Sequence, residues 1–414
     1  MLQKKVLCTF IPFITGILGI FSQIPISVQG SIHNNPWVQN VEEKFLNICN
    51  QGINLGAYNY NAEKTKPIIP DAHCRYRDCF LHNAGFVGCS CCAFIPIGGL
   101  NNHFQGIARL PEYLGLGNYV LVTGNNNHAD TDIEFGPAAH LFVIHLSSQS
   151  GQGPFRYAQS REDRIVGMLN LTEDAPGYIH PGGIQTCGRY LAIPMEGPGG
   201  NGKVIFYAMD CQDGVLNFAK LSVELPTDNA SCGAVALTRL ADGHYLIGVW
   251  AGVTLVLYYS TSTNLAQERY FAKIATITPA DFVSSSGSWG YFQPGQAPQN
   301  INFVNDENGM LYLLTSDNTG QYSPVIKGTD FAVLFKLYLP QNINPDDATG
   351  GCKLVYLADR AFVCNRNADF KAAAGFYVPN QKALALYASY HWLKGWNLLC
   401  HNFKNSYISI MQFV

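Results

Sequence analysis

The chain has 414 residues, a formal net charge of -3 and only 13% charged residues, so it lacks the basic stripe that nucleic-acid binding requires. No block of like charges suggests a solvated tail or a membrane-surface patch. Its 40 glycines and its 12% of aromatic residues are typical of many short strands joined by tight turns. The composition therefore favours a large β domain and excludes an obvious nucleic-acid partner.

Residues 1–30 have the pattern of an export signal. Lys4 and Lys5 precede an apolar run over Val6–Phe21, and polar residues follow over Ser27–Gly30. A single membrane anchor is the alternative, but the run is short and is interrupted by proline and glycine. No other segment is apolar enough to span a bilayer. We therefore expect a secreted or periplasmic protein with no membrane span once the signal is removed.

Residues 31–87 are predicted to form a cysteine-rich extension that packs on a propeller domain over 88–414. Of the 13 cysteines, one lies in the signal, and half of the remaining twelve precede residue 100. An even number in an oxidising compartment is compatible with disulfides. Zinc is the alternative for the C-x-C-C cluster, although no CxxC or HxxxH partner lies nearby. The six cysteines are Cys49, Cys74, Cys79, Cys89, Cys91 and Cys92.

One strand pattern recurs five times from residue 88 onwards. Each copy has a Gly- or Ala-rich strand, a second apolar strand and a third, and a fourth candidate lies between copies, as at Phe218–Leu225. Propeller blades need four antiparallel strands with a small, glycine-rich innermost member, because the inner strands crowd near the axis. The first strands of the copies begin at Gln105, Gly182, Gly233, Ile301 and Ala372.

The fifth copy lacks an outer strand, because the chain ends at Val414 after its third strand. Cys89–Ile97 has a suitable length and composition for the missing strand. We therefore predict that the N-terminal segment closes the ring, which hides sheet edges that would otherwise pair with other chains. A sixth blade built from residues 45–97 is the alternative.

In this repeat the chain resembles the β-propeller class over about residues 88–414. The resemblance is to the fold alone, because WD dipeptides, kelch di-glycine repeats and Asp-box motifs are lacking. It implies an all-β fold, a five-bladed β-propeller, whose function lies in the loops of one face. Five-bladed propellers include glycoside-acting enzymes and lectins, so the fold cannot choose between catalysis and binding.

Two histidines are candidates for the chemistry on the loop-rich face. His103 and His180 occupy equivalent positions, each at the start of an innermost strand. Two imidazoles near the axis could hold a divalent metal, or one could act as a base. In the alternative reading each ring only hydrogen-bonds a neighbouring loop.

Acidic residues on the same face extend this set. Asp130, Asp132 and Glu134 alternate in one loop, and Asp132 and Glu134 are candidate ligands for Ca²⁺ or Zn²⁺. Glu196 directly follows a strand and could pair with Asp130 as general acid and base. The alternative is that the loop acids are merely solvated.

Aromatic residues in the long loops are candidates for ligand contact. Exposed aromatic rings stack on sugars or anchor protein partners, whereas buried ones pack one loop against another. The candidates are Trp289, Tyr291, Trp392 and Trp396, with His391 beside them.

The sequence thus leaves two main functions open. The first is an exported binding propeller that recognises a glycan or a protein at one asymmetric site. The second is an exported hydrolase, metal-assisted or not, that uses His103, His180 and a loop carboxylate. A purely structural role is less favoured, because one face is rich in polar residues.

Overall fold

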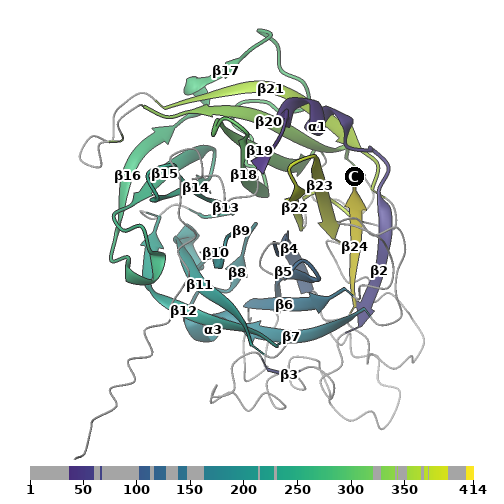
Figure 1. Ribbon diagram of the computed structural model, residues 1–414, viewed down its shortest axis with the longest axis vertical. Coiled ribbons are helices and arrows are strands. Elements are labelled where there is room, and N and C mark those ends of the chain that lie inside the picture. Colours follow the sequence, from purple (N-terminus) through teal and green to yellow (C-terminus); the bar gives the residue numbers. More distant parts are fainter. Residues whose placement is uncertain are drawn as a thin grey trace, which may run out of the picture.

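The fold was analysed in a computed structural model. Its strands form a ring of sheets around a central axis, and the innermost strands lie nearest the centre (Figure 1). The structure describes residues 37–59, 66–67, 102–111, 116–126, 139–146, 163–212, 215–227, 231–319, 328–340, 343, 352–364, 368–371, 373–389 and 407–414.

The described strands form five antiparallel units of four, and each unit runs from the axis outwards. Unit 1 contains β4 (Asn102–Arg109), β5 (Tyr119–Asn126), β6 (Ala139–His145) and β7 (Arg164–Asn170). In unit 2 the inner strand is split into β8 (His180–Pro181) and β9 (Gln185–Cys187), followed by β10 (Tyr190–Glu196), β11 (Gly202–Gln212) and β12 (Val215–Pro226). Unit 3 contains β13 (Ala234–Arg239), β14 (Tyr245–Ala251), β15 (Thr254–Ser260) and β16 (Phe271–Ile277).

Units 4 and 5 take additional strands from elsewhere in the chain. Unit 4 contains β18 (Asn300–Asp306), β19 (Leu311–Asn318), β20 (Asp330–Tyr338) and β21 (Lys353–Phe362), with β17 (Phe282–Ser284) parallel to β21 and β1 (Trp37–Val38) parallel to β18. Unit 5 contains β22 (Ala374–Asn380), β23 (Ala383–Ser389), β24 (Tyr407–Phe413) and, outermost, β2 (Ile53–Asn59). The short β3 (Lys66–Pro67) pairs with β7.

The few helical segments lie in the connections. They are α1 (Val41–Asn47), α3 (Leu171–Asp174) and the 3₁₀ turns η4 (Pro198–Gly200), η5 (Leu265–Gln267) and η6 (Pro279–Asp281). No helix in the described part of the chain is long and apolar enough to cross a membrane.

The units pack against one another in a closed cycle. Five buried apolar clusters lie in turn between units 1 and 2, 2 and 3, 3 and 4, 4 and 5, and 5 and 1. Face-to-face burial of both sides of each sheet explains why the strands are apolar throughout rather than alternating. The chain is a β-propeller.

Glycines allow the inner strands to meet at the axis, as their composition predicts. A Cβ atom on Gly182 would overlap the Gly233 carbonyl oxygen, and one on Gly375 would overlap the Ile107 carbonyl oxygen. The partly buried amide of Gln185 then joins unit 2 to units 3 and 4, because its Oε1 accepts the N–H groups of Leu237 (2.9 Å) and Phe303 (2.8 Å). The centre is thus a rigid, close-packed support for the loops above it.

An N-terminal strand completes unit 5, as predicted, but it is β2, within the predicted extension 31–87, rather than Cys89–Ile97. Strand β2 pairs antiparallel with the C-terminal strand β24 along the outer edge of the ring (Figure 1). Residues 68–100 lie outside the described residues, and with them most of the segment on which the six-blade alternative depended.

The segment that leads into β2 is anchored under units 4 and 5. The side chains of Val41 and Phe45 on α1 are buried, and the Phe45 ring lies 6.5 Å from that of Phe376. The Arg360 guanidinium donates to the carbonyl oxygens of Phe45, at 3.0 Å, and of Ile48, which satisfies acceptors at the end of the helix. Ring closure therefore depends on a docked helix as well as on strand pairing.

The predicted disulfides are not found in the described residues. No disulfide joins any two of the six cysteines there, and Cys49 is the only one of the predicted disulfide set among them. Burial raises the pKa of Cys187 to about 12 and that of Cys352 to about 11, so both behave as apolar core residues. The other five cysteines of the predicted set lie outside the described residues.

Candidate functional site

The innermost strands begin at one end of the axis, which we call the mouth. Gly106 of β4 faces Ala374 of β22 in a parallel bridge, and Gly183 faces Ala234 in another. The start of β18 lies at the same end, because Gly183 packs directly against Asn300. The ends of the second strands and the starts of the third strands also meet there. The mouth is therefore the loop-rich face that the sequence predicted.

His180 and Glu196 form a hydrogen-bonded pair at the mouth of unit 2. Their strands place them directly opposite each other, because β8 pairs with β10 in the register His180 to Glu196. His180 Nδ1 lies 2.8 Å from Glu196 Oε2, and the two side chains are 31% and 23% exposed. Exposed fractions of this size leave both groups within reach of a ligand.

Gln105 fixes the other side of the imidazole. Its Nε2 atom lies 3.0 Å from His180 Nε2, and the Gln105 side chain is buried in unit 1. With a proton on Nδ1, the ring donates to Glu196 and accepts from the Gln105 amide, so both ring nitrogens are occupied. His180 therefore orients Glu196 rather than offering a free basic nitrogen. The Glu196 carboxylate remains partly exposed beside the oriented ring.

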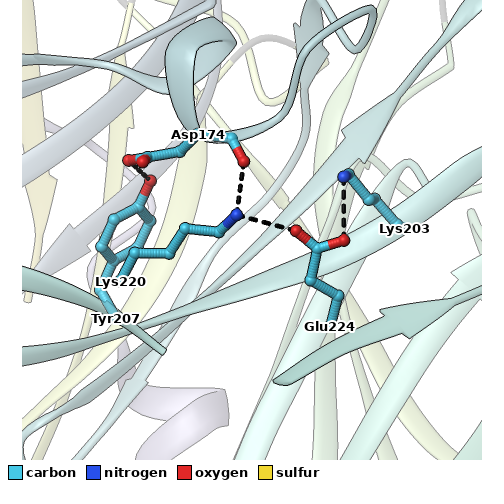
Figure 2. Close-up of polar contacts among 5 residues, drawn as sticks. All are labelled: Asp174, Lys203, Tyr207, Lys220 and Glu224. Atoms are coloured by element: carbon cyan, nitrogen blue, oxygen red, sulfur yellow. Dashed lines mark hydrogen bonds and ion pairs between the residues drawn. The ribbon is translucent and has the colours of Figure 1, made fainter. Parts of the chain in front are cut away.

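A polar network on the rim of units 1 and 2 supports this pair (Figure 2). Glu224 of β12 accepts from Lys203 Nζ at 3.0 Å and from Lys220 Nζ at 2.8 Å. Burial raises the pKa of Glu224, but the hydrogen bonds from Lys220 and Lys203 outweigh it, and the net shift is downwards. Glu224 thus stays ionised and holds both lysines.

The network continues to α3 and to the loop beside His180. Lys220 Nζ donates to the Asp174 carbonyl oxygen at 2.5 Å, and the Tyr207 hydroxyl donates to Asp174 Oδ2 at 2.6 Å (Figure 2). Lys203 Nζ also lies 4.6 Å from the centre of the Tyr178 ring, and that ring packs against Gly197. Lys203 therefore holds Tyr178 and Gly197, which lie close to His180 and Glu196 in the sequence.

Three aspartates, Asp317, Asp330 and Asp369, gather at the mouth of units 4 and 5, and none of them is among the site residues predicted from the sequence. Asp330 Oδ1 accepts from Asn318 Nδ2 at 2.7 Å and from the Phe370 N–H at 2.9 Å. Burial, and then the charge of Asp330, raises the pKa of Asp369. The signal available was their position, because Asp317 lies at the end of β19, Asp330 begins β20, and Asp369 lies in the connection from β21 to β22.

Asp317 is the most perturbed of the three. Burial raises its pKa to about 7, against the opposing effects of the Asn318 N–H and of Lys371, and Asp369 and Asp330 add to the rise. A carboxyl group with such a pKa is protonated in much of the population at neutral pH, so it can donate a hydrogen bond.

The two aromatic candidates described by the structure differ in their roles. The Trp289 ring is half-buried and packs on Tyr356 at 5.1 Å between centroids, which is the loop-packing alternative. Tyr291 is 42% exposed and stacks on Phe331, which is the cross-strand partner of Asp317. Only Tyr291 of this pair is placed for ligand contact.

Seven of the predicted site residues have side chains outside the described part of the chain. The backbone of His103 lies in β4 opposite Asn125, but its side chain is not among those described, so its pairing with His180 stays a prediction. The remaining candidates lie outside the described residues, namely Asp130, Asp132, Glu134, His391, Trp392 and Trp396. Within the described part of the chain no group of three or more His, Cys, Asp or Glu residues could hold a metal ion. The Ca²⁺ or Zn²⁺ site stays a prediction.

No family model matches the sequence, and no curated protein matches it. Among solved structures, a mutant of Trypanosoma rangeli sialidase with trans-sialidase activity aligns with 72% of this chain and 43% of its own, at 8% identity and a TM-score of 0.34. The β-xylosidase RS223 aligns with 75% of this chain and 91% of its own, at 9% identity and a TM-score of 0.39. A GH43_1 enzyme from Xanthomonas citri, solved in complex with xylose, aligns with 76% of this chain and 87% of its own, at 12% identity and a TM-score of 0.39. The chain thus spans less than half of the sialidase.

Proposed function

We propose that the mouth of the propeller binds a glycan, and that Glu196 is the central polar contact. The supporting observation is the series Gln105, His180 and Glu196, in which a buried amide orients an imidazole and the imidazole orients a partly exposed carboxylate. A carboxylate held in this way accepts hydrogen bonds from hydroxyl groups without first losing side-chain freedom.

A glycan fits this arrangement better than a peptide does. The described groups are a carboxylate, an imidazole and amides, which suit the hydroxyl groups of an uncharged ligand. Their support is rigid, because the inner strands below them are in backbone contact. Rigid placement of a few polar groups is how a binding site obtains orientation and specificity.

The experiment is a glycan array probed with the full chain. We expect binding to one class of glycan, and we expect Glu196→Gln to reduce it by about tenfold or more, since one charge-assisted hydrogen bond is lost. The matched control is Glu43→Gln, a carboxylate on α1 at the other end of the propeller. Binding that survives Glu196→Gln, or capture of proteins but of no glycan, would contradict the proposal.

Glycoside hydrolysis is the second candidate, and one observation favours it. Asp317, with its pKa raised to about 7, lies at the same mouth as Glu196. A protonated carboxyl can give its proton to the leaving glycosidic oxygen while a carboxylate takes a proton from the attacking water. The test is release of reducing sugar from the glycan found on the array. Turnover that is unchanged in both Glu196→Gln and Asp317→Asn would contradict this assignment.

A further inference from the structure

Tyr291 presents an exposed ring at a fixed position of the mouth. The ring is 42% exposed, and its other face stacks on Phe331 at 5.8 Å between centroids and 23° between planes. Most large apolar side chains of the described residues are buried, so an exposed ring that is stacked from below is a surface for contact. Phe331 belongs to β20 of unit 4, across the axis from His180.

The loop that carries Tyr291 is held by its backbone. Asp359 Oδ2 accepts the N–H groups of Tyr291 and, at 3.2 Å, of Phe292. The Gly290 N–H donates to the Tyr356 hydroxyl at 3.2 Å, and a Cβ atom on Gly290 would overlap the Asp359 carboxylate. The ring is therefore preorganised, so a ligand that stacks on it loses little affinity to ordering of the loop.

Two buried polar groups lie beside the platform. Asp317 is the cross-strand partner of Phe331, and Thr315, two residues earlier, lies on the same face of β19. Asp317 Oδ1 accepts the Asn318 N–H at 2.8 Å. Thr315 is 1% exposed, and its hydroxyl has no hydrogen-bond partner among the described residues. A buried hydroxyl without a partner is costly unless something else bonds it.

We propose that Tyr291, Asp317 and Thr315 form a subsite for one sugar ring, with a C–H face of the sugar on Tyr291 and its hydroxyls on the two polar groups. This subsite rests on the proposed function for its class of ligand. It lies on unit 4, whereas Glu196 lies on unit 2. The glycan therefore contacts both sides of the mouth, which favours an oligosaccharide over a single sugar.

An organic ammonium ion is the rival occupant, because aromatic rings and carboxylates bind cations. The charges around Asp317 disfavour it. Lys371 already supplies a positive charge to the Asp317 carboxyl, while Asp369 and Asp330 repel its ionised form, and Asn318 donates its backbone N–H to that carboxyl. Thr315 can donate to a sugar oxygen and accept from a sugar hydroxyl, but an ammonium ion without N–H groups satisfies neither role.

Ligand-observed saturation-transfer NMR on the full chain tests the subsite. The probes are the methyl β-pyranosides of xylose, glucose and galactose, with tetramethylammonium as the rival. We expect at least one glycoside to bind at about pH 6, where Asp317 holds its proton, and Tyr291→Ala to weaken it by about five- to tenfold. Tyr270→Ala, a 64% exposed tyrosine on unit 3, should leave it unchanged.

The same spectra separate this subsite from the Glu196 site. Glu196→Gln should leave glycoside binding to unit 4 intact while it weakens the whole glycan on the array. Absence of binding by every methyl glycoside, equal losses in Tyr291→Ala and Tyr270→Ala, or Tyr291-dependent binding of tetramethylammonium that grows above about pH 7 would each overturn the subsite. None of these results would affect array binding that depends on Glu196, so the two proposals fail separately.

Discussion

Replacing Asp317 by Asn should change how the stability of the propeller depends on pH. The Asn side chain keeps the shape of the carboxyl group, and its Oδ1 can still accept the Asn318 N–H. Folding raises the pKa of Asp317 from 3.8 to about 7, chiefly through burial. The native state therefore holds this proton more tightly than the unfolded state does, and the free energy of unfolding falls as pH rises from about 4 to about 7.

The magnitude follows from the same numbers. A rise in pKa from 3.8 to about 7 corresponds to about 4 kcal/mol of stability that the wild type has at low pH and loses above about pH 7. The Asn variant carries no such proton. The difference in free energy of unfolding, variant minus wild type, should therefore increase by about 4 kcal/mol between about pH 4 and pH 8.

Urea unfolding followed by tryptophan fluorescence measures the difference. Both proteins are compared at each pH, so that the effect of Asp369, whose pKa is also raised, largely cancels. Parallel stability profiles for the two proteins would refute the reasoning, because they would show that Asp317 titrates with its ordinary pKa in the folded chain.

Further predictions concern closure of the ring, its axis and its rim. Phe45→Ala should destabilise the fold by about 3–5 kcal/mol, because the ring is fully buried under units 4 and 5, whereas Leu46→Ala, 45% exposed, should cost little in urea unfolding. Gly375→Ala should lower the thermal midpoint through overlap with the Ile107 carbonyl, and Gly233→Ala, with open space around it, should cost far less. Lys203→Met should reduce glycan affinity severalfold in titration calorimetry, because Glu224 and Tyr178 lose the cation that joins them.

The sequence predicts the propeller well because its repeat reflects packing. Gly182 and Gly375 are glycines because backbones of neighbouring units touch there, and the three-strand fifth copy leaves an outer position that an N-terminal strand, β2, fills. The identity of that strand was not predictable from length and composition alone. Strand β2 takes the position because α1 docks ahead of it under units 4 and 5, with Arg360 as its anchor.

The candidate site was predictable only in part. His180 and Glu196 follow from the repeat, because each lies at a strand end on the predicted face, but their pairing depends on register. Gln105 was missed as a site residue because it lies within a strand and resembles an ordinary core position. Asp317 was missed because nothing local marks it, and its raised pKa comes from burial by residues distant in the sequence.

The most direct test of the account is a map of the bound glycan by hydrogen exchange. With the glycan selected on the array, we expect slower amide exchange at the mouth, over 178–183 and 194–202 in unit 2 and over 289–292 and 315–318 in unit 4, and none around α1. Protection around α1 and β1 instead, or no change at the mouth at saturating glycan, would contradict the claim that the mouth is the working surface of this propeller.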